Sequence, residues 1–186
     1  MKILKYLLIA VAVLAALFFL FGWPYLQEQT KKISPEKTAT YQKNGMDLSV
    51  NYSSPFKKNR IIFGELVPYD KIWRTGANEP TTFTTTTDIN IIDKKLPAGT
   101  YSLWTKPKKE SWQVIFNKEV PGWGVSMFSG GAKTSRDPEQ DALQVDLATE
   151  SLSTTQESFT IDFEENNQLY LIFSWDQTKV KVPINK

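Results

Sequence analysis

Residues 63–80 hold the densest group of side chains that could take part in chemistry. Within six residues the segment places a guanidinium, an amide and a carboxylate, and two aromatic rings lie beside them. Arginine presents a planar fork of donors to carboxylate or sugar oxygens, asparagine donates and accepts, and glutamate accepts from hydroxyls. A connecting loop needs only turn formers and solubility, so this composition predicts a binding surface. Its residues are Tyr69, Trp73, Arg74, Asn78 and Glu79.

The same segment has a structural interpretation. Arg74 and Glu79 could pair with each other or with buried backbone and so fix a long loop onto the domain, because buried backbone groups need hydrogen-bond partners. Mutation separates the two interpretations. Truncating Arg74 or Asn78 leaves stability nearly unchanged if the residue serves a ligand, and costs about 2 kcal/mol if it leaves buried groups unpaired.

The composition restricts the catalytic chemistry. The chain contains no histidine and no cysteine, which excludes imidazole bases, thiolate nucleophiles, disulfides and Cys/His zinc sites. Glu65, Asp70 and Glu79 lie within fifteen residues, so a cofactor-independent hydrolase that uses loop carboxylates is an alternative function. The polar residues at 88–93 lack the glycine and the distal glutamate of a calcium loop. We therefore predict no metal and no cofactor.

Tryptophan supplies a second candidate contact. Trp112 and Trp175 lie in apolar alternations and are expected in the core. Trp123 is framed by Pro121, Gly122 and Gly124, so we expect it on an exposed loop. There it could stack on a glycan or another flat ligand.

The N-terminus predicts a membrane anchor. Lys2 and Lys5 precede an unbroken apolar run over residues 6–23, and those 18 residues span roughly 27 Å as a helix, close to the hydrocarbon thickness of a bilayer. A cleaved signal peptide would need a small-x-small site after a shorter run. The one such triplet, at residues 10–12, lies inside the run. We expect a single-pass protein whose domain lies on the extracytoplasmic side.

The sequence thus predicts four parts: a cytoplasmic tip (1–5), a transmembrane anchor in contact with the lipid bilayer (6–26), a polar stalk (27–44) and a globular domain (45–186). Both lysines of residues 1–26 belong to the tip, and the rest of the chain carries 20 basic and 20 acidic residues. A nucleic-acid-binding surface needs a basic surplus. We therefore expect no nucleic-acid partner.

The domain has the periodicity of β-strands. Apolar and polar residues alternate from Met46 to Tyr52, which places the two sets on opposite faces. About eight or nine such runs, separated by short polar turns, predict an all-β fold, an antiparallel β-sandwich or jelly roll. The expected strands lie at 46–52, 82–87, 89–92, 100–104, 112–117, 143–147, 159–163, 169–175 and 179–184.

One turn carries a conformational prediction. Pro97 and Gly99 follow Leu96 directly before an alternating strand. We expect Gly99 to adopt a positive φ, which a Cβ atom would make costly.

Three blocks resemble a known family. They are Val67-Pro68-Tyr69 with residues 73–79, the turn and strand at 96–103, and the strand at 112–117. Together they resemble the bacterial domain-of-unknown-function family 2911 over roughly residues 46–184. The resemblance implies an exported protein and supports the fold. It implies no activity, because the function of that family is not established.

The expected function is therefore a membrane-anchored module at the cell envelope that binds a ligand, a glycan or another small molecule, or takes part in an interaction. The hydrolase described above is one alternative, and a purely structural envelope component is another. The sequence predicts neither the ligand nor the oligomeric state.

Overall fold

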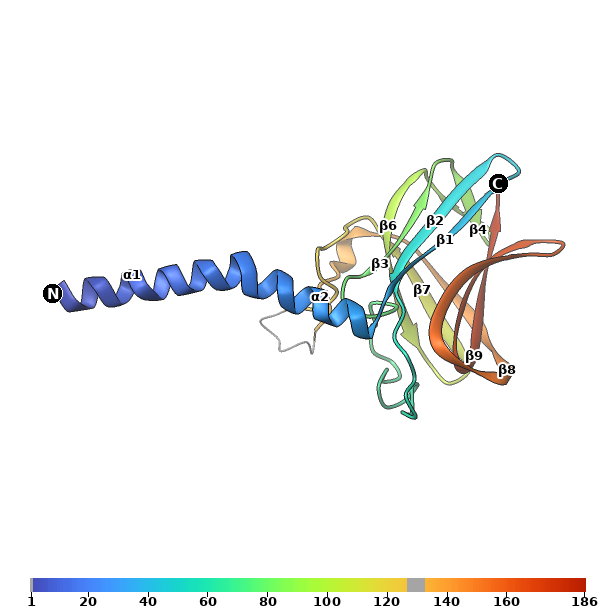
Figure 1. Cartoon of the computed structure of the whole chain (residues 1–186). Coiled ribbons are helices and arrows are strands. Elements are labelled where there is room, and N and C mark those ends of the chain that lie inside the picture. Colours follow the sequence, from blue (N-terminus) through green and yellow to red (C-terminus); the bar gives the residue numbers. More distant parts are fainter. Residues whose placement is uncertain (1, 127–132) are drawn as a thin grey trace. The chain divides into compact units, whose positions relative to one another are not determined.

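A computed structural model describes residues 2–126 and 133–186. The chain divides into two compact units, residues 1–33 and Ser34–Lys186. The first unit is helical and the second is built from β-strands (Figure 1).

The first unit is one helical span from Lys2 to Ile33. It comprises α1 (Lys2–Leu17), a π-helical turn (Phe18–Gly22) and α2 (Trp23–Ile33). The π turn ends two residues before Pro24, which has no N–H and would crowd a regular α-helical turn. No side chain of α1 is buried. The helix is long and apolar enough to cross a membrane, a property that membrane anchors and signal sequences share.

The described part of the second unit contains nine strands in one sheet, in the order β1-β2-β3-β6-β7-β8-β9-β4-β5. Every neighbouring pair is antiparallel. This confirms the predicted all-β antiparallel class. The strands are β1 (Glu36–Lys43), β2 (Met46–Ser53), β3 (Thr81–Thr85), β4 (Ile89–Ile91), β5 (Lys94–Leu96), β6 (Gly99–Pro107), β7 (Ser111–Asn117), β8 (Asp141–Glu165) and β9 (Leu169–Asn185).

Strands β8 and β9 carry the sheet from one side of the core to the other. The first part of β8 pairs with β7, and from Thr149 onward β8 pairs with β9. The register of the β8–β9 pair shifts on either side of Gln156, which lies opposite Asp176. Asp176 has a positive φ of 54°. These irregularities let both strands bend. Figure 1 shows the resulting curve. The runs that we predicted as separate strands at 143–147 and 159–163, and again at 169–175 and 179–184, are therefore parts of two long strands.

The core lies between the two parts of the curved sheet. Leu48 and Phe83 come from the first part, Leu171 and Val182 come from the second, and all four are fully buried in one cluster. Because both parts contribute inward-facing residues, neither part buries its apolar face alone.

The boundary of the domain differs from the prediction. Within the expected stalk at 27–44, α2 extends to Ile33 and residues 36–43 form β1. Ala39 and Tyr41 are buried in alternation with exposed threonines, so this segment has a strand period of its own. It pairs with β2 through the turn at Asn44 and Gly45, both of which have positive φ. Asn-Gly favours two-residue hairpin turns for this reason.

The prediction for Gly99 is wrong. Gly99 is the first residue of β6 and pairs with Thr85, and it is not among the residues with positive φ. The preceding turn is held instead by Asp88, whose Oδ1 atom accepts the backbone N–H of Ala98 at 2.9 Å.

A buried ion pair at the start of β8 generates the first prediction. The side chains of Arg136 and Asp141 are only 10% and 9% exposed, and Asp141 also accepts hydrogen bonds from Asn117 and Gln144. We expect Asp141→Ala to lower the free energy of unfolding by about 3–5 kcal/mol, because it leaves the Arg136 charge buried and uncompensated.

Lys95→Ala is the matched control. It removes an ion pair to Asp88 whose two side chains are more than half exposed, so it should lower the free energy of unfolding far less than Asp141→Ala does. Chemical denaturation followed by tryptophan fluorescence measures both variants. Equal losses in the two would contradict the structural role given to Asp141.

Candidate functional site

The segment at 63–80 is fixed to the domain by Trp73. Its backbone pairs with Thr105 of β6 through N–H···O bonds of 2.7 and 2.9 Å, and its indole N–H donates to the carbonyl of Gly76 at 3.0 Å. The ring stacks on Trp175 at 5.9 Å and meets Phe159 edge-on at 4.9 Å. Trp73 is thus part of the aromatic core as well as of the loop.

The backbone after Trp73 takes a path that few sequences allow. Thr75 and Asn78 have φ values of 57° and 58°, and Gly76 has a φ of 146°. A Cβ atom at Gly76 would lie 2.8 Å from the carbonyl oxygen of Ser53, so only glycine fits there. Thr75 is fully buried, and its carbonyl accepts the hydroxyl of Thr81 at 2.5 Å. This bond helps to hold Thr75, a β-branched residue, at a positive φ that such residues rarely adopt.

One side of this segment borders a cavity of about 590 Å³, which we call the Arg74 cavity. Apolar side chains and three cationic ones line it. Among the described lining residues there is no aspartate or glutamate. The described residues that line the Arg74 cavity are Leu66, Val67, Pro68, Lys71, Ile72, Trp73, Arg74, Val125, Lys133 and Thr134.

Arg74 is the unusual member of this lining. Its Nε atom is buried and has no hydrogen-bond partner among the described residues. Its aliphatic stem packs so closely on Gly124 that a Cβ atom there would overlap the Cδ atom of Arg74. Burial lowers the pKa of the guanidinium from its ordinary value. Arg74 as a whole is half-buried. A partly desolvated cation is costly when none of the described residues pairs with it, and an anion in the cavity would offset part of that cost.

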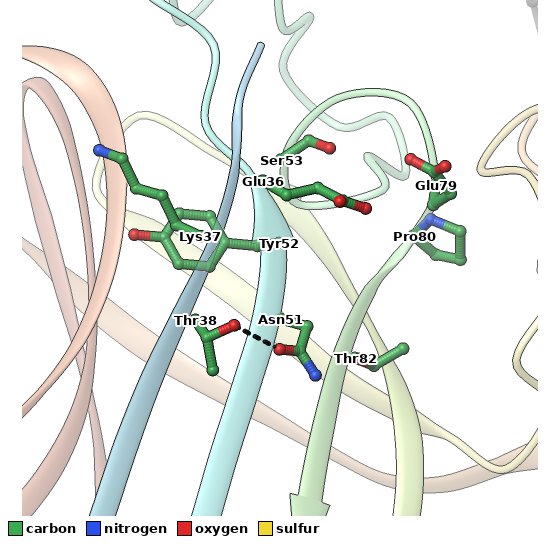
Figure 2. A pocket seen from close by; sticks show the side chains of 9 residues that line it. All are labelled: Glu36, Lys37, Thr38, Asn51, Tyr52, Ser53, Glu79, Pro80 and Thr82. Atoms are coloured by element: carbon green, nitrogen blue, oxygen red, sulfur yellow. Dashed lines mark hydrogen bonds between the residues drawn. The ribbon is translucent and has the colours of Figure 1, made fainter. Parts of the chain in front are cut away.

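A second, smaller cavity of about 280 Å³ lies on β1, β2 and the start of β3, and we call it the β1–β3 cavity. Figure 2 shows the carboxylates of Glu36 and Glu79 at one end of it and a row formed by Thr38, Asn51 and Thr82 at the other. The remaining lining residues are Lys37, Tyr52, Ser53 and Pro80.

The two cavities divide the residues that the sequence predicted as one surface. Trp73 and Arg74 line the first, and Glu79 lines the second. Asn78 is buried, with its Nδ2 atom 3.5 Å from the hydroxyl of Ser53, and its carbonyl accepts the N–H of Gly124 at 3.1 Å. It therefore holds the loop.

Tyr69 and Trp123 line neither cavity. Both side chains are half-buried. The ring of Tyr69 lies over Gly64, where an added Cβ atom would come within 3.0 Å of it. Trp123 is less exposed than its Pro/Gly surroundings predicted, and its carbonyl accepts the hydroxyl of Ser135.

The carboxylates of the hydrolase alternative are also separated. Glu79 lines the β1–β3 cavity, whereas Glu65 and Asp70 are exposed and line neither cavity. Within residues 2–126 and 133–186, no three His, Cys, Asp or Glu side chains form a group that could hold a metal ion.

Sequence reasoning missed several lining residues. Val125 and Thr134 approach the Arg74 cavity as an isolated antiparallel bridge far along the chain from Arg74. Glu36 lay in the segment that we assigned to a stalk. The alternation at 36–43 was the signal that could have placed Glu36 on a sheet.

A family model described as "Protein of unknown function (DUF2911)" matches residues 34–184. The match confirms the resemblance carried by the blocks at 67–79, 96–103 and 112–117. It begins at the first residue of the strand-built unit and leaves the apolar helix outside. No curated protein and no solved structure matches the chain.

The contrast between Arg74 and Asn78 generates the second prediction. Arg74→Met keeps the aliphatic stem and removes a charge that has no partner among the described residues. We expect its free energy of unfolding to equal or exceed that of the wild type.

Asn78→Ala is the comparison. It removes a buried amide from a residue at positive φ, so it should cost about 1–2 kcal/mol. Chemical denaturation of both variants makes the measurement. A loss of more than about 2 kcal/mol in the free energy of unfolding of Arg74→Met would mean that the guanidinium stabilises the loop. Arg74 would then not be available as a contact for a ligand in the Arg74 cavity.

Proposed function

Since the chain belongs to the DUF2911 family of proteins of unknown function, we propose its function from its own site. The protein is a membrane-anchored module outside the cytoplasm. It binds a small molecule that has an anionic group and an apolar body, and the Arg74 cavity is the binding site.

The observation that carries the proposal is the buried, unpartnered Nε atom of Arg74 beside a cavity. A carboxylate or phosphate group in the cavity would lie beside the Arg74 guanidinium and offset the cost of its desolvation. Hydrogen bonds between charged groups contribute about 1.5–3 kcal/mol, more than neutral ones. Lys71 also lines the cavity, and its charge favours the same sign of ligand.

The rest of the lining favours an apolar body on that ligand. Leu66, Ile72 and Val125 supply aliphatic surface, and Trp73 supplies part of an aromatic ring. The cavity volume of about 590 Å³ lies within the range of small-molecule sites, which are mostly apolar with a few placed polar groups.

Binding has more support than the other two functions. The hydrolase would need two carboxylates near each other, and Glu65 and Asp70 line neither cavity. A purely structural domain would gain nothing from a buried Nε atom of Arg74 that has no hydrogen-bond partner among the described residues, because an apolar residue of similar volume would avoid the desolvation cost.

The helix from Lys2 to Ile33 places this site near a membrane in the proposed arrangement. Residues 6–23 span the bilayer, Lys2 and Lys5 stay on the cytoplasmic side, and Trp23 and Tyr25 lie at the far interface, where aromatic side chains are favoured.

The third prediction tests ligand binding with naphthoate, an aromatic carboxylate. The full chain is placed in nanodiscs of zwitterionic lipid, and its thermal unfolding midpoint is measured. At about 100 times its Kd, naphthoate should raise the midpoint by roughly 5–10 °C, because a ligand that binds only the folded state stabilises it.

Two controls define the contact. Naphthylmethanol has the same ring system without the charge and should give little shift. Arg74→Met should abolish the naphthoate shift while leaving the midpoint without ligand at or above that of the wild type. Equal shifts for both compounds, or for both proteins, would contradict the role of Arg74.

The fourth prediction concerns the anchor. We expect the mature chain to keep Met1 or Lys2 at its N-terminus and to fractionate with membranes after high-salt and carbonate washes. Intact-mass measurement checks this. A mature chain that begins between Gly22 and Lys32 would show that the helix is a cleaved signal sequence.

A further inference from the structure

The outer face of β1, β2, β3 and β6 is an ordered array of uncharged polar side chains. Two rows cross the strands in register, and none of their residues is buried. We call them the hydroxyl face. One row is Thr38, Asn51 and Thr82, and the next is Thr40, Ser49, Thr84 and Thr100.

Side-chain hydrogen bonds within the rows fix parts of this array. The hydroxyl of Thr38 donates to Oδ1 of Asn51 at 2.7 Å, and the hydroxyls of Thr84 and Thr100 are 3.0 Å apart. Threonine is also stiff at χ1. Neighbouring rows lie about 7 Å apart and neighbouring strands about 4.8 Å apart, so polar groups repeat at short, regular intervals over this face of the sheet.

Carboxylates border the hydroxyl face at both ends. Glu36 and Glu79 line the β1–β3 cavity, which begins at the row of Thr38 (Figure 2). At the other end Asp47 accepts a hydrogen bond from Gln42 at 3.2 Å. Lys37 is the one cation among the described residues that line the β1–β3 cavity. Two carboxylates beside a single lysine disfavour anions such as nucleic acids, which require several cationic contacts.

The chemistry of the face also disfavours a protein partner. Stable protein interfaces have an apolar or aromatic centre, and the two rows contain only threonine, serine and asparagine. Two copies of this face would also form an interface without an apolar centre, so the same argument disfavours self-association through it.

We infer that the hydroxyl face and the β1–β3 cavity bind a neutral glycan chain. Sugar hydroxyls donate and accept, as threonine and serine hydroxyls do, so each sugar can exchange hydrogen bonds with a row. A carboxylate beside the rows, such as that of the exposed Glu36, accepts a hydroxyl hydrogen more strongly than a neutral group would. The cavity of about 280 Å³ receives one sugar ring. The two rows of the hydroxyl face bind the sugars that follow it in the glycan.

This site is separate from the Arg74 cavity, since none of the described lining residues is shared by the two cavities. The two sites differ in charge and in ligand. Failure of one proposal leaves the other standing.

Affinity electrophoresis of the full chain tests the inference. Native gels contain hydroxyethyl cellulose, dextran or galactomannan as neutral polysaccharides, and carboxymethyl cellulose as the anionic comparison. The detergent must have no sugar headgroup, because such a headgroup would compete. We expect at least one neutral polysaccharide to retard the wild type and carboxymethyl cellulose to retard it less.

Two variants locate the contact. Thr40→Val with Thr84→Val removes two hydroxyls and keeps β-branched side chains, and should weaken the retardation constant by about fivefold per hydroxyl. Glu36→Gln alters an exposed side chain and should also weaken it several-fold. Thr154→Val, at an exposed position of β8, should leave it unchanged.

Retardation by none of the three neutral polysaccharides would overturn the inference. So would equal retardation of the wild type and of both face variants. Stronger retardation by carboxymethyl cellulose than by the neutral polymers would contradict the charge argument.

Discussion

The packing of Trp73 is the interaction on which both candidate sites depend. Its ring stacks on Trp175 and contacts Phe159, and its backbone pairs with Thr105 of β6. A loop of this length has no regular hydrogen-bond ladder of its own, so the half-buried ring of Trp73 and its two strand-like backbone bonds do much to fix its position. Arg74 is therefore placed by the core of the domain.

The segment after Trp73 then separates opposite charges. Gly76 passes so close to the carbonyl of Ser53 that no side chain fits, and the buried Asn78 ties the loop to Gly124. Arg74 remains on one side with cationic and apolar neighbours, and Glu79 lies on the other with hydroxyls and Glu36. Two cavities of different character thus arise from one short stretch of chain.

Sequence patterns predicted the elements better than their assembly. Alternation identified most strands, and the density of polar groups at 69–79 identified the loop that contributes to both cavities. The Asn44-Gly45 hairpin carried a local signal, yet the charged residues around it suggested a stalk. The bends of β8 and β9 near Gln156 and Asp176 interrupt the apolar alternation, so each long strand was predicted as two shorter ones, because bulges and turns share polar residues. The separation of Arg74 from Glu79 depends on contacts with Ser53 and Gly124, which no local pattern encodes.

The most direct test of the central claim is the ¹H–¹⁵N signal of the Arg74 Nε group in the labelled full chain. The chain contains three arginines, and Arg60 and Arg136 serve as internal references because each already has hydrogen-bond acceptors. On titration with naphthoate we predict a saturable shift of the Arg74 signal while the other two stay in place. Binding of naphthoate without movement of the Arg74 signal, or the same movement with naphthylmethanol, would contradict the claim.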